Sequence, residues 1–443
     1  MWKNVAEVAS PVDGEAVGPE FKFLKSPVPE CVRAFRCTIF AAMSSLHQVF
    51  LDHLAQTSPH PLALDIVKAE GCYLYDRSGK RCLDLVAGLA VNNVGHRHPN
   101  VISAIKDQCD KYLHVIPYGE FVQEPQVRFA EKLTSLLPPS LNSVYFVNSG
   151  TEAIEASLKL AKRATGRMQV IGCKKSYHGS THGSLSLTDN GKKRYRNLPL
   201  LPDTAHITFG SAGQVDEAME DLSLITERTA CVVVEPIQGD AGVRIPDQSW
   251  MSALRKRCDD VGALLVFDEV QTGFGRTGKL FAFEHFRIVP DILVLGKALG
   301  GGLPMGAFIS SRERMHLLTH DPVLGHITTF GGHPLPCVAG LAAVNALHDE
   351  GMIENAQRMG KQFKKLLVHP KIKEVRGEGL MLAVDLGDAD LVQRVVMGCL
   401  EKGVLGFWFL SCPTAFRIAP PLVMDEEQVK EACAVILAEL RIG

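Results

Sequence analysis

The sequence predicts an α/β fold with a mostly parallel central sheet, helices on both of its faces and a smaller α+β domain. Three observations carry this prediction. Helical and strand patterns alternate from residue 127 to residue 334, as they do when helices connect parallel strands. The strands are short runs of branched apolar residues, which is typical of strands buried on both faces. After Pro334 long helices and mixed strands replace the alternation, which indicates a second domain.

The expected elements follow in chain order. A hairpin over residues 72–85 has Ser78-Gly79 as its turn, and a helix begins near Val101. The alternating region is expected to contain helices 127–137, 152–164 and 249–261 and strands 144–147, 169–173, 231–234, 264–267, 292–295 and 307–310. The last part is expected to contain helix 335–350, a helix ending at 367, strands within 374–386 and 416–422, and helix 426–440.

This pattern divides the chain into four parts. We expect a large domain at residues 96–334, and a smaller domain formed by residues 335–443 together with residues 43–95. Residues 1–42 show no clear periodicity, and their acidic residues argue against a transit peptide. We interpret them as a disordered extension or a start placed too early, with Met43 as the alternative start.

The composition excludes several classes of protein. Of 443 residues, 46% are hydrophobic and 22% are charged, and the net charge is -2. A chain without a basic tract has no general attraction to nucleic acid or to an anionic membrane. No run approaches the ~20 apolar residues of a spanning helix. The 12 cysteines form no C-x-x-C pair, so we expect buried thiols in a reducing, cytoplasmic compartment.

Two charged residues follow neighbouring strands of the predicted sheet. Asp268 follows the run 264–267, and Lys297 comes just after the run 292–295. Because ligands bind outside the carboxyl ends of parallel strands, both side chains are expected in one crevice. Burial leaves a lysine amine neutral and able to form a Schiff base with an aldehyde, and a carboxylate can keep a pyridine nitrogen protonated. The pair predicts pyridoxal 5'-phosphate (PLP) as cofactor, with a strand-end salt bridge as the alternative.

Other motifs stand at the ends of further strands. Segment 148–152 (NSGTE) opens a helix, where free N–H groups suit a phosphate, and an ordinary N-cap is the alternative. The ring of Tyr177 could stack on a cofactor or only pack at the rim. Glu235 and Asp240 place two carboxylates near the crevice. Arg417, in the smaller domain, could clamp a substrate carboxylate or be a surface arginine.

Two further patterns are set aside. Segment 273–278 (GFGRTG) satisfies G-x-G-x-x-G, but Lys297 ends the next strand where a dinucleotide-binding fold has an acid. His96 and His98 form an H-x-H pair without a third ligand at a recognisable spacing, so we interpret them as loop histidines. No metal site is predicted.

The order of these motifs resembles that of the class III (ω-) aminotransferases, PLP-dependent enzymes of fold type I. The resemblance extends from near residue 50 to the end of the chain. The segments that carry it are NSGTEA, YHG, EPIQG, DEVQTGFGRTG, LGKALGGGLPMGA and TTFGGHP.

The resemblance implies a role for each candidate residue. Lys297 would hold the cofactor and shuttle a proton, Asp268 would pair with the pyridine nitrogen, and Arg417 would bind the α-carboxylate of glutamate and 2-oxoglutarate. The remaining cofactor contacts would come from Gly150 and Thr151 at the phosphate, Tyr177 stacked on the ring, Gln271 near the phenolic oxygen, and Thr329 at the phosphate of the neighbouring subunit. A residue that reaches the neighbouring subunit implies a homodimer with shared active sites.

Two positions depart from the family's pattern. Asp240 stands where the family usually has glutamate, and Ser180 stands where acetylornithine aminotransferases typically have arginine. The donor therefore stays open between acetylornithine, ornithine, 4-aminobutyrate and another ω-amine. The implied activity is transfer of that amino group to 2-oxoglutarate, giving glutamate. The alternatives are an aminomutase or decarboxylase of the same fold, and a non-catalytic amine-binding regulator.

Overall fold

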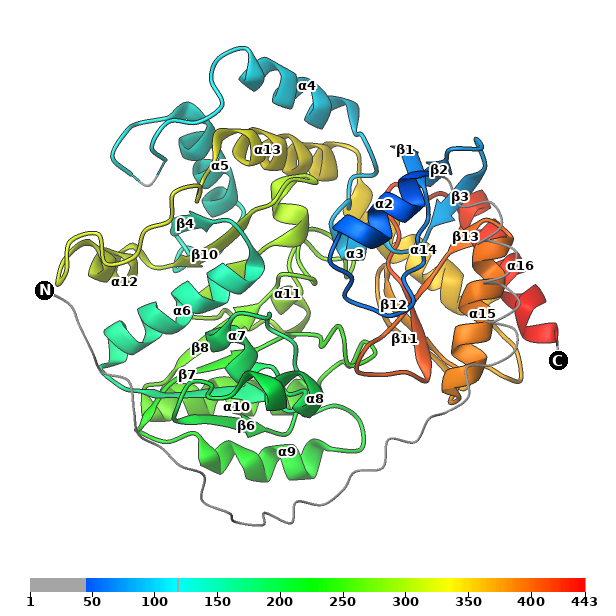
Figure 1. Ribbon diagram of the computed structural model, residues 1–443. Coiled ribbons are helices and arrows are strands. Elements are labelled where there is room, and N and C mark those ends of the chain that lie inside the picture. The colour runs from blue at the N-terminus through cyan, green and yellow to red at the C-terminus, as the bar shows by residue number, and fades with distance from the viewer. Residues whose placement is uncertain (1–44, 118, 443) are drawn as a thin grey trace, which may run out of the picture. The chain divides into compact units, whose positions relative to one another are not determined.

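The computed structural model describes residues 45–117 and 119–442 (Figure 1). The interpretation of residues 1–42 and of Met43 lies outside these residues. The described residues divide into two units between residues 65 and 66. The described part of the first unit contains helix α2 (Ser45–His53). All three sheets described next belong to the second unit.

A seven-stranded sheet lies at the centre of the second unit, with the strand order β4-β10-β9-β8-β7-β5-β6. Its strands are β4 (Ser143–Val147), β5 (Gln169–Cys173), β6 (Thr204–Ile207), β7 (Thr229–Val234), β8 (Leu264–Asp268), β9 (Ile292–Leu295) and β10 (Gly306–Ser310). Strand β10 is antiparallel to β4 and β9. The pairs from β9 to β6 are all parallel. The predicted mostly parallel sheet is confirmed.

Helices cover both faces of this sheet. Val232 and Val234 of β7 belong to the same apolar cluster as Trp250 of α10 (Gln248–Val261). The alternate residue Val233 belongs to a second cluster, with Leu158 of α6 (Gly150–Thr165). Because successive side chains of a strand point to opposite faces, α10 and α6 lie on opposite sides of the sheet (Figure 1).

Two four-stranded sheets accompany the central one, in the orders β1-β2-β3-β13 and β11-β12-β15-β14. Their strands are β1 (Ile66–Glu70), β2 (Tyr73–Asp76), β3 (Arg81–Asp84), β11 (Glu374–Glu378), β12 (Met381–Asp385), β13 (Val404–Leu405), β14 (Phe407–Trp408) and β15 (Ala415–Ile418). Strand β13 pairs with β3, so the last hundred or so residues share a sheet with the segment after residue 66. The division at residues 43–95, 96–334 and 335–443 stays our proposal.

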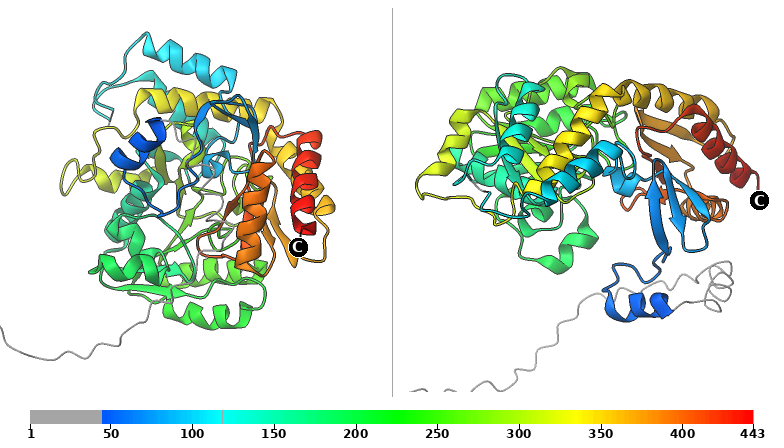
Figure 2. Two further views of the ribbon diagram at one scale, coloured as in Figure 1. Left: turned by 45° about the vertical axis from the view of Figure 1, so that its right-hand side comes forward. Right: turned by 90° about the horizontal axis from the view of Figure 1, so that it is seen from above.

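The remaining helices complete the unit. They are α3 (Ala87–Ala90), α4 (Pro99–Cys109), α5 (Glu124–Ser135), α7 (His182–Leu187), α8 (Gly191–Arg194), α9 (Val215–Asp221), α11 (Phe283–Phe286), α12 (Arg312–His316), α13 (Pro334–Asp349), α14 (Met352–Leu366), α15 (Ala389–Glu401) and α16 (Glu426–Arg441). Helices α4 and α13 pack side by side (Figure 2). Across the described part of the chain, no helix has the length and apolar character needed to span a bilayer.

Most predicted elements are present within a few residues of their expected limits, including the hairpin β2–β3. Several short elements were not predicted, and neither were strand β6 and helix α15. Strand β6 (TAHI) lacks a branched apolar run because it is an edge strand with only one neighbour, β5. Helix α15 begins at the N-cap Asp388, whose side chain accepts from the N–H groups of Asp390 and Leu391. Its pattern was not singled out in the sequence.

Candidate active site

The residues that follow strands β4, β8 and β9 lie in close contact with one another. A Cβ on Gly296, after β9, would lie 3.2 Å from Cα of Gly150, at the start of α6 after β4. A Cβ on Gly150 would lie 2.8 Å from the side chain of Val270, after β8. Side chains at these two glycines would therefore push the strand ends apart. The contact brings the start of α6 next to the residues that follow Asp268 and precede Lys297.

Lys297 is the first residue after this contact on β9. Its φ of 46° is in the left-handed region, which is uncommon for a residue with a side chain and is often found at functional sites. Burial lowers the pKa of Lys297 below its ordinary value, against the opposing effect of Asp268. The charges of Arg417, Glu235 and Asp240 also act on this amine. The structure therefore gathers the predicted charged residues around Lys297.

Asp268 ends β8 and is held by a residue that the sequence had not singled out. Its Oδ2 lies 2.7 Å from Nδ1 of His178, and its Oδ1 accepts from the N–H of Val270 at 3.0 Å. Burial alone would lower the pKa of His178, but the hydrogen bond and charge of Asp268 raise it above its ordinary value. The carboxylate of Asp268 is thus oriented by a buried imidazole, whose protonated form it favours.

Glu235 lies beside this pair and bonds to the backbone. Its carboxylate accepts from the N–H of Tyr177 at 3.1 Å and from the N–H of Gly239 at 2.9 Å. Burial raises the pKa of Glu235 to about 7. These contacts join the loops that follow β5 and β7. They support a structural role for Glu235, and its predicted contact with substrate stays a prediction.

The start of α6 has the features of a phosphate site. Ser149 caps the helix by accepting from the N–H of Glu152 at 3.3 Å, and the first amides of a helix have no acceptor within it. Thr151 presents its hydroxyl to those of Thr181 at 2.8 Å and Ser184 at 2.6 Å. The N-cap and the anion site thus coexist, because the cap occupies only one amide.

A glycine lies against this hydroxyl cluster. Gly179 has a φ of 135°, and a Cβ there would lie 2.3 Å from Oγ1 of Thr151, so its loop packs closely on Thr151. Glu155, one turn along α6, accepts the Thr181 hydroxyl at 2.5 Å and the N–H of Gly183 at 2.8 Å. The carboxylate holds the loop after Gly179 against the helix start.

Tyr177 and Gln271 flank the same crevice. Tyr177 is about one-third exposed, its hydroxyl lies 3.3 Å from Oγ of Ser180, and Nζ of Lys193 lies 4.5 Å from its ring centre. A Cβ on Gly239 would lie 2.2 Å from Oε1 of Gln271, so that amide packs against the loop after β7. Both residues line the region where a cofactor ring is expected.

Arg417 comes from the smaller sheet and pairs with Asp240. Its Nη2 lies 3.4 Å from Oδ1 of Asp240, and both side chains are largely buried, at 9% and 13% exposed. The guanidinium carbon lies 4.6 Å from the ring centre of Phe409, and Nε has no hydrogen-bond partner. Burial lowers the pKa of Arg417, against the effect of Asp240. The surface-arginine alternative is excluded.

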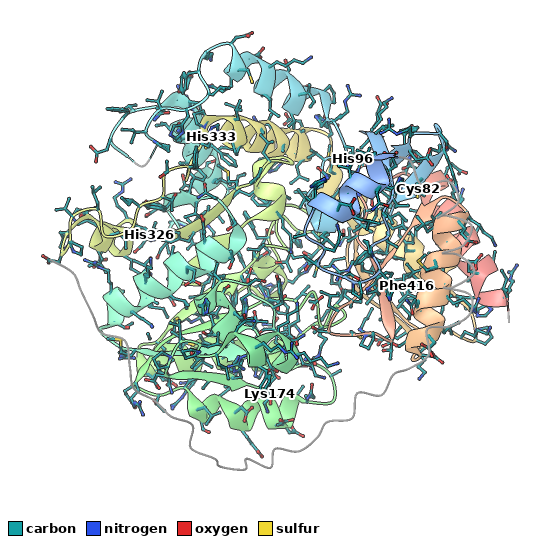
Figure 3. All side chains as sticks on the ribbon, in the orientation of Figure 1. Cys82, His96, Lys174, His326, His333 and Phe416 are labelled. Carbon is teal, nitrogen blue, oxygen red and sulfur yellow. The ribbon has the colours of Figure 1, made fainter. Side chains whose placement is uncertain are left out.

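Thr329 is exposed and lies in the loop before α13, beside an apolar surface. We define this surface by its exposed apolar residues, Leu113, Val115, Ile116, Phe121, Val122, Val127, Val323, Leu324, Ile327 and Phe330. The two segments touch, since the rings of His114 and Phe330 are 4.9 Å apart. His326 and His333 lie along the same loop (Figure 3). A groove of about 270 Å³ borders it, lined by Phe121, Tyr145 and Gly331 among others.

The two patterns set aside in the sequence have ordinary contacts. His96 lies 2.8 Å from Asp84, and His98 lies 3.0 Å from Glu350 (His96 is labelled in Figure 3). In the described residues no cluster of three potential metal ligands occurs. In the GFGRTG segment, the fully buried Arg276 donates to the carbonyl oxygens of Leu380 and Pro420. The arginine ties this turn to the smaller sheets.

The fold and this site define a class of protein, the α/β transferases that hold PLP by a lysine between parallel strand ends. The model of the family "Aminotransferase class-III" matches residues 54–440. The chain therefore belongs to the class III aminotransferases, and it is a transaminase of the ω-aminotransferase type.

Individual proteins show how far this likeness extends. An acetylornithine aminotransferase of Methanopyrus kandleri is 40% identical over 391 residues, which are 88% of this chain and 97% of that protein. The ornithine aminotransferase of Toxoplasma gondii ME49 superimposes with a TM-score of 0.81 at 29% identity, over 92% of this chain and 97% of that one. An amine transaminase from an uncultivated Pseudomonas species, in its PLP-bound form, has a TM-score of 0.80 at 27% identity, over 88% and 100%.

Proposed function

We propose that this transaminase uses PLP to move the amino group of an ω-amino donor to 2-oxoglutarate, giving glutamate. The donor belongs to the class of acetylornithine, ornithine and 4-aminobutyrate. One observation carries the proposal: Arg417 is a buried guanidinium near Lys297 whose one ion-pair contact is long. A cation with unused donors at that place suits a ligand carboxylate, as the α-carboxylate of glutamate and 2-oxoglutarate would provide.

The residues present fit PLP. The start of α6 with Thr151 would hold the phosphate, Tyr177 and Gln271 would contact the ring, and Asp268 would meet the pyridine nitrogen. The close packing of Gly179, where a Cβ would lie 2.3 Å from the Thr151 hydroxyl, keeps the loop after β5 beside the start of α6, as this assignment requires. When bound, PLP supplies an aldehyde for the amine and a ring that withdraws electrons from the substrate carbon.

Lys297 is proposed to carry the cofactor and then to act as the base. Its lowered pKa favours the neutral amine, the form that would accept a proton from the substrate carbon. Asp268, held by His178 at 2.7 Å, would keep the pyridine nitrogen protonated. The backbone amides of the α6 start would keep the phosphate still while the proton moves.

Asp240 and Arg417 are proposed to admit two kinds of substrate in turn. An ω-amino donor places an uncharged methylene group where glutamate has its α-carboxylate. With the donor bound, Asp240 balances the buried charge of Arg417, which is otherwise costly. With glutamate or 2-oxoglutarate bound, the substrate carboxylate takes the place of Asp240.

The alternatives make different products. An aminomutase or a decarboxylase of this fold would use the same lysine without needing a carboxylate site for a second substrate, which is why Arg417 favours transamination. A regulator that only binds an amine would not need the pairing of His178 with Asp268. One molecule of glutamate formed for each donor consumed separates transamination from the alternatives.

We also propose a cytoplasmic homodimer with shared active sites. The apolar surface beside Thr329 supports the dimer, because exposed apolar residues that gather on one surface often mark a protein–protein interface. Thr329 would then reach the phosphate site of the partner subunit. The ten cysteines in the described residues all have free thiols, and most of them are buried, which suits a reducing compartment.

A screen of donors against 2-oxoglutarate tests the proposal. Acetylornithine, ornithine, 4-aminobutyrate, a diamine and an α-amino acid would each be incubated with loaded enzyme, with glutamate as the measured product. At least one ω-amino donor should give stoichiometric glutamate, and the Lys297→Ala enzyme should give none. Consumption of a donor with release of carbon dioxide, or isomerisation without glutamate, would contradict the proposal.

A further inference from the structure

Asp240 is held by Ser411 as well as by Arg417. The hydroxyl of Ser411 donates to Oδ2 of Asp240 at 2.7 Å. The other oxygen, Oδ1, receives two longer contacts, from the N–H of Leu410 at 3.4 Å and from Nη2 of Arg417 at 3.4 Å. The shortest hydrogen bond of this carboxylate is therefore to the serine, and its contact with the arginine is longer and weaker.

The arrangement leaves the Asp240–Arg417 pair short of its best geometry. A guanidinium and a carboxylate can form two parallel N–H···O bonds at about 2.7–2.9 Å. Here one nitrogen meets one oxygen at 3.4 Å, while Oδ2 points to Ser411. Phe409 lies against the guanidinium at 4.6 Å and limits its movement on that side.

The serine is in turn fixed to the same loop as Asp240. Arg376 donates from Nε to the carbonyl oxygen of Gly242 at 2.6 Å, and its Nη2 lies 3.7 Å from Sγ of Cys412. A Cβ on Gly242 would lie 2.7 Å from that sulfur. The loop that contains Asp240 and the segment that contains Ser411 thus pack tightly, and the serine hydroxyl stays within reach of Oδ2.

We propose that Ser411 is a positioning residue that keeps the Asp240–Arg417 pair weak enough for a substrate carboxylate to replace Asp240. The inference rests on the proposed function, in which Arg417 binds the α-carboxylate of the acceptor. Without the serine bond, Oδ2 can turn toward the guanidinium, and the pair gains its second hydrogen bond. The substrate carboxylate then competes against a stronger partner. Ser411 therefore sets how readily the enzyme accepts 2-oxoglutarate and glutamate, while it leaves the ω-amino donor unaffected.

The test compares three single variants of the loaded enzyme. Ser411→Ala should raise KM for 2-oxoglutarate about three- to tenfold, the effect of about one ordinary hydrogen bond. The rate constant of the donor half-reaction should not change. Ser411→Thr, which keeps the hydroxyl, should stay close to the wild type. Ser223→Ala is the matched control, because it removes the hydroxyl of an exposed serine that donates to the carbonyl oxygen of Glu220 and does not contact Asp240.

A double variant separates positioning from a general loss of structure. In the Asp240→Ala background, Ser411→Ala should have no further effect on KM, since the carboxylate it positions is gone. The idea is overturned if Ser411→Ala leaves KM unchanged or lowers it, or if its effect persists without Asp240.

A second measurement keeps this result apart from the proposed function. Glutarate is a dicarboxylate without a keto group, and its dissociation constant can be measured by the absorbance change of the bound cofactor. That constant should rise by the same factor in Ser411→Ala. A wild-type enzyme that makes no glutamate would contradict the proposed function, and the glutarate comparison would still decide the role of Ser411.

Discussion

Nδ1 of His178 donates to Oδ2 of Asp268 at 2.7 Å, and both side chains are almost completely buried, at 0% and 6% exposed. The bond ties the loop after β5 to the end of β8, two strands away in the sheet order. It orients the carboxylate that is proposed to meet the pyridine nitrogen. The other ring nitrogen, Nε2, has no hydrogen-bond partner in the described residues. The hydrogen bond to Asp268 is therefore the one that favours the protonated form of this imidazole.

The raised pKa of His178 predicts a pH-dependent part of the stability. Because the folded pKa lies above the unfolded one, this contribution is fully present below the ordinary histidine value of about 6.5 and is lost as pH rises through the folded pKa. His178→Gln should remove it. The melting temperature of the wild type minus that of His178→Gln should therefore fall as pH rises from about 6.5 through the folded pKa.

His206 provides a control of opposite sign. Burial lowers its pKa, so the folded state resists protonation and its contribution is lost as pH falls below about 6.5. The wild type minus His206→Gln difference should therefore rise with pH. A shift of one pKa unit is about 1.4 kcal/mol, or about 2 °C or less in a chain of this length. Parallel slopes for the two variants would contradict the assignment of His178.

The sequence predicted those parts of the site that follow from local pattern. Asp268 and Lys297 could be found because each ends a run of branched apolar residues, and strand ends of a parallel sheet meet at one edge. His178 and Ser411 could not be found in this way. Their partners lie 90 and 171 residues away in the chain, and a histidine or a serine in a loop carries no signal until the fold brings it to a carboxylate.

Lys297→Ala should fold and bind PLP without holding it covalently. After dialysis against a primary amine it should lose the yellow absorbance that the wild type keeps, and it should produce no measurable glutamate, because both the anchor and the base are gone. Lys256→Ala, at an exposed lysine paired with Asp260, is the control. Turnover at the wild-type rate would show that another amine carries the cofactor.

Asp268→Asn keeps the shape of the side chain but removes the charge that would hold the pyridine nitrogen protonated. Proton removal from the substrate should slow about a hundred- to thousandfold, since stabilisation of this kind is commonly worth about 3–4 kcal/mol. Single-turnover absorbance measures this step directly. Asp259→Asn, at an exposed position of α10, should leave it unchanged. A rate close to that of the wild type would mean that Asp268 does not pair with the ring nitrogen.

The shared site predicts complementation between two defective subunits. In the proposed dimer, Thr329→Ala is expected to weaken the phosphate site of the partner, and Lys297→Ala is expected to inactivate its own site. In a hybrid dimer of the two, one site combines an intact Lys297 with the Thr329 of the other chain. Hybrids formed at subsaturating PLP should therefore be more active than either parent dimer. If they are not, Thr329 serves the site of its own chain or no site.

Asp240→Ala tests whether the carboxylate guards Arg417 between the two half-reactions. In the glutamate half-reaction the substrate carboxylate must first displace Asp240, so removal of the acid should speed binding and reaction. In the ω-amine half-reaction nothing replaces Asp240, and the variant leaves a largely buried cation without a partner, which should slow that half-reaction. The two rate constants should thus move apart in favour of glutamate.

The size of this shift follows from the geometry of the pair. Only one nitrogen of Arg417 meets Asp240, at a long distance, and Ser411 already holds the other oxygen of Asp240. The free energy at stake is therefore on the order of 1–2 kcal/mol, although the pair is largely buried. Stopped-flow absorbance gives the ratio of the two rate constants, with Glu374→Ala, an exposed acid paired with Arg376, as the control. An unchanged ratio, or one that moves toward the ω-amine, would mean that Asp240 does not guard Arg417.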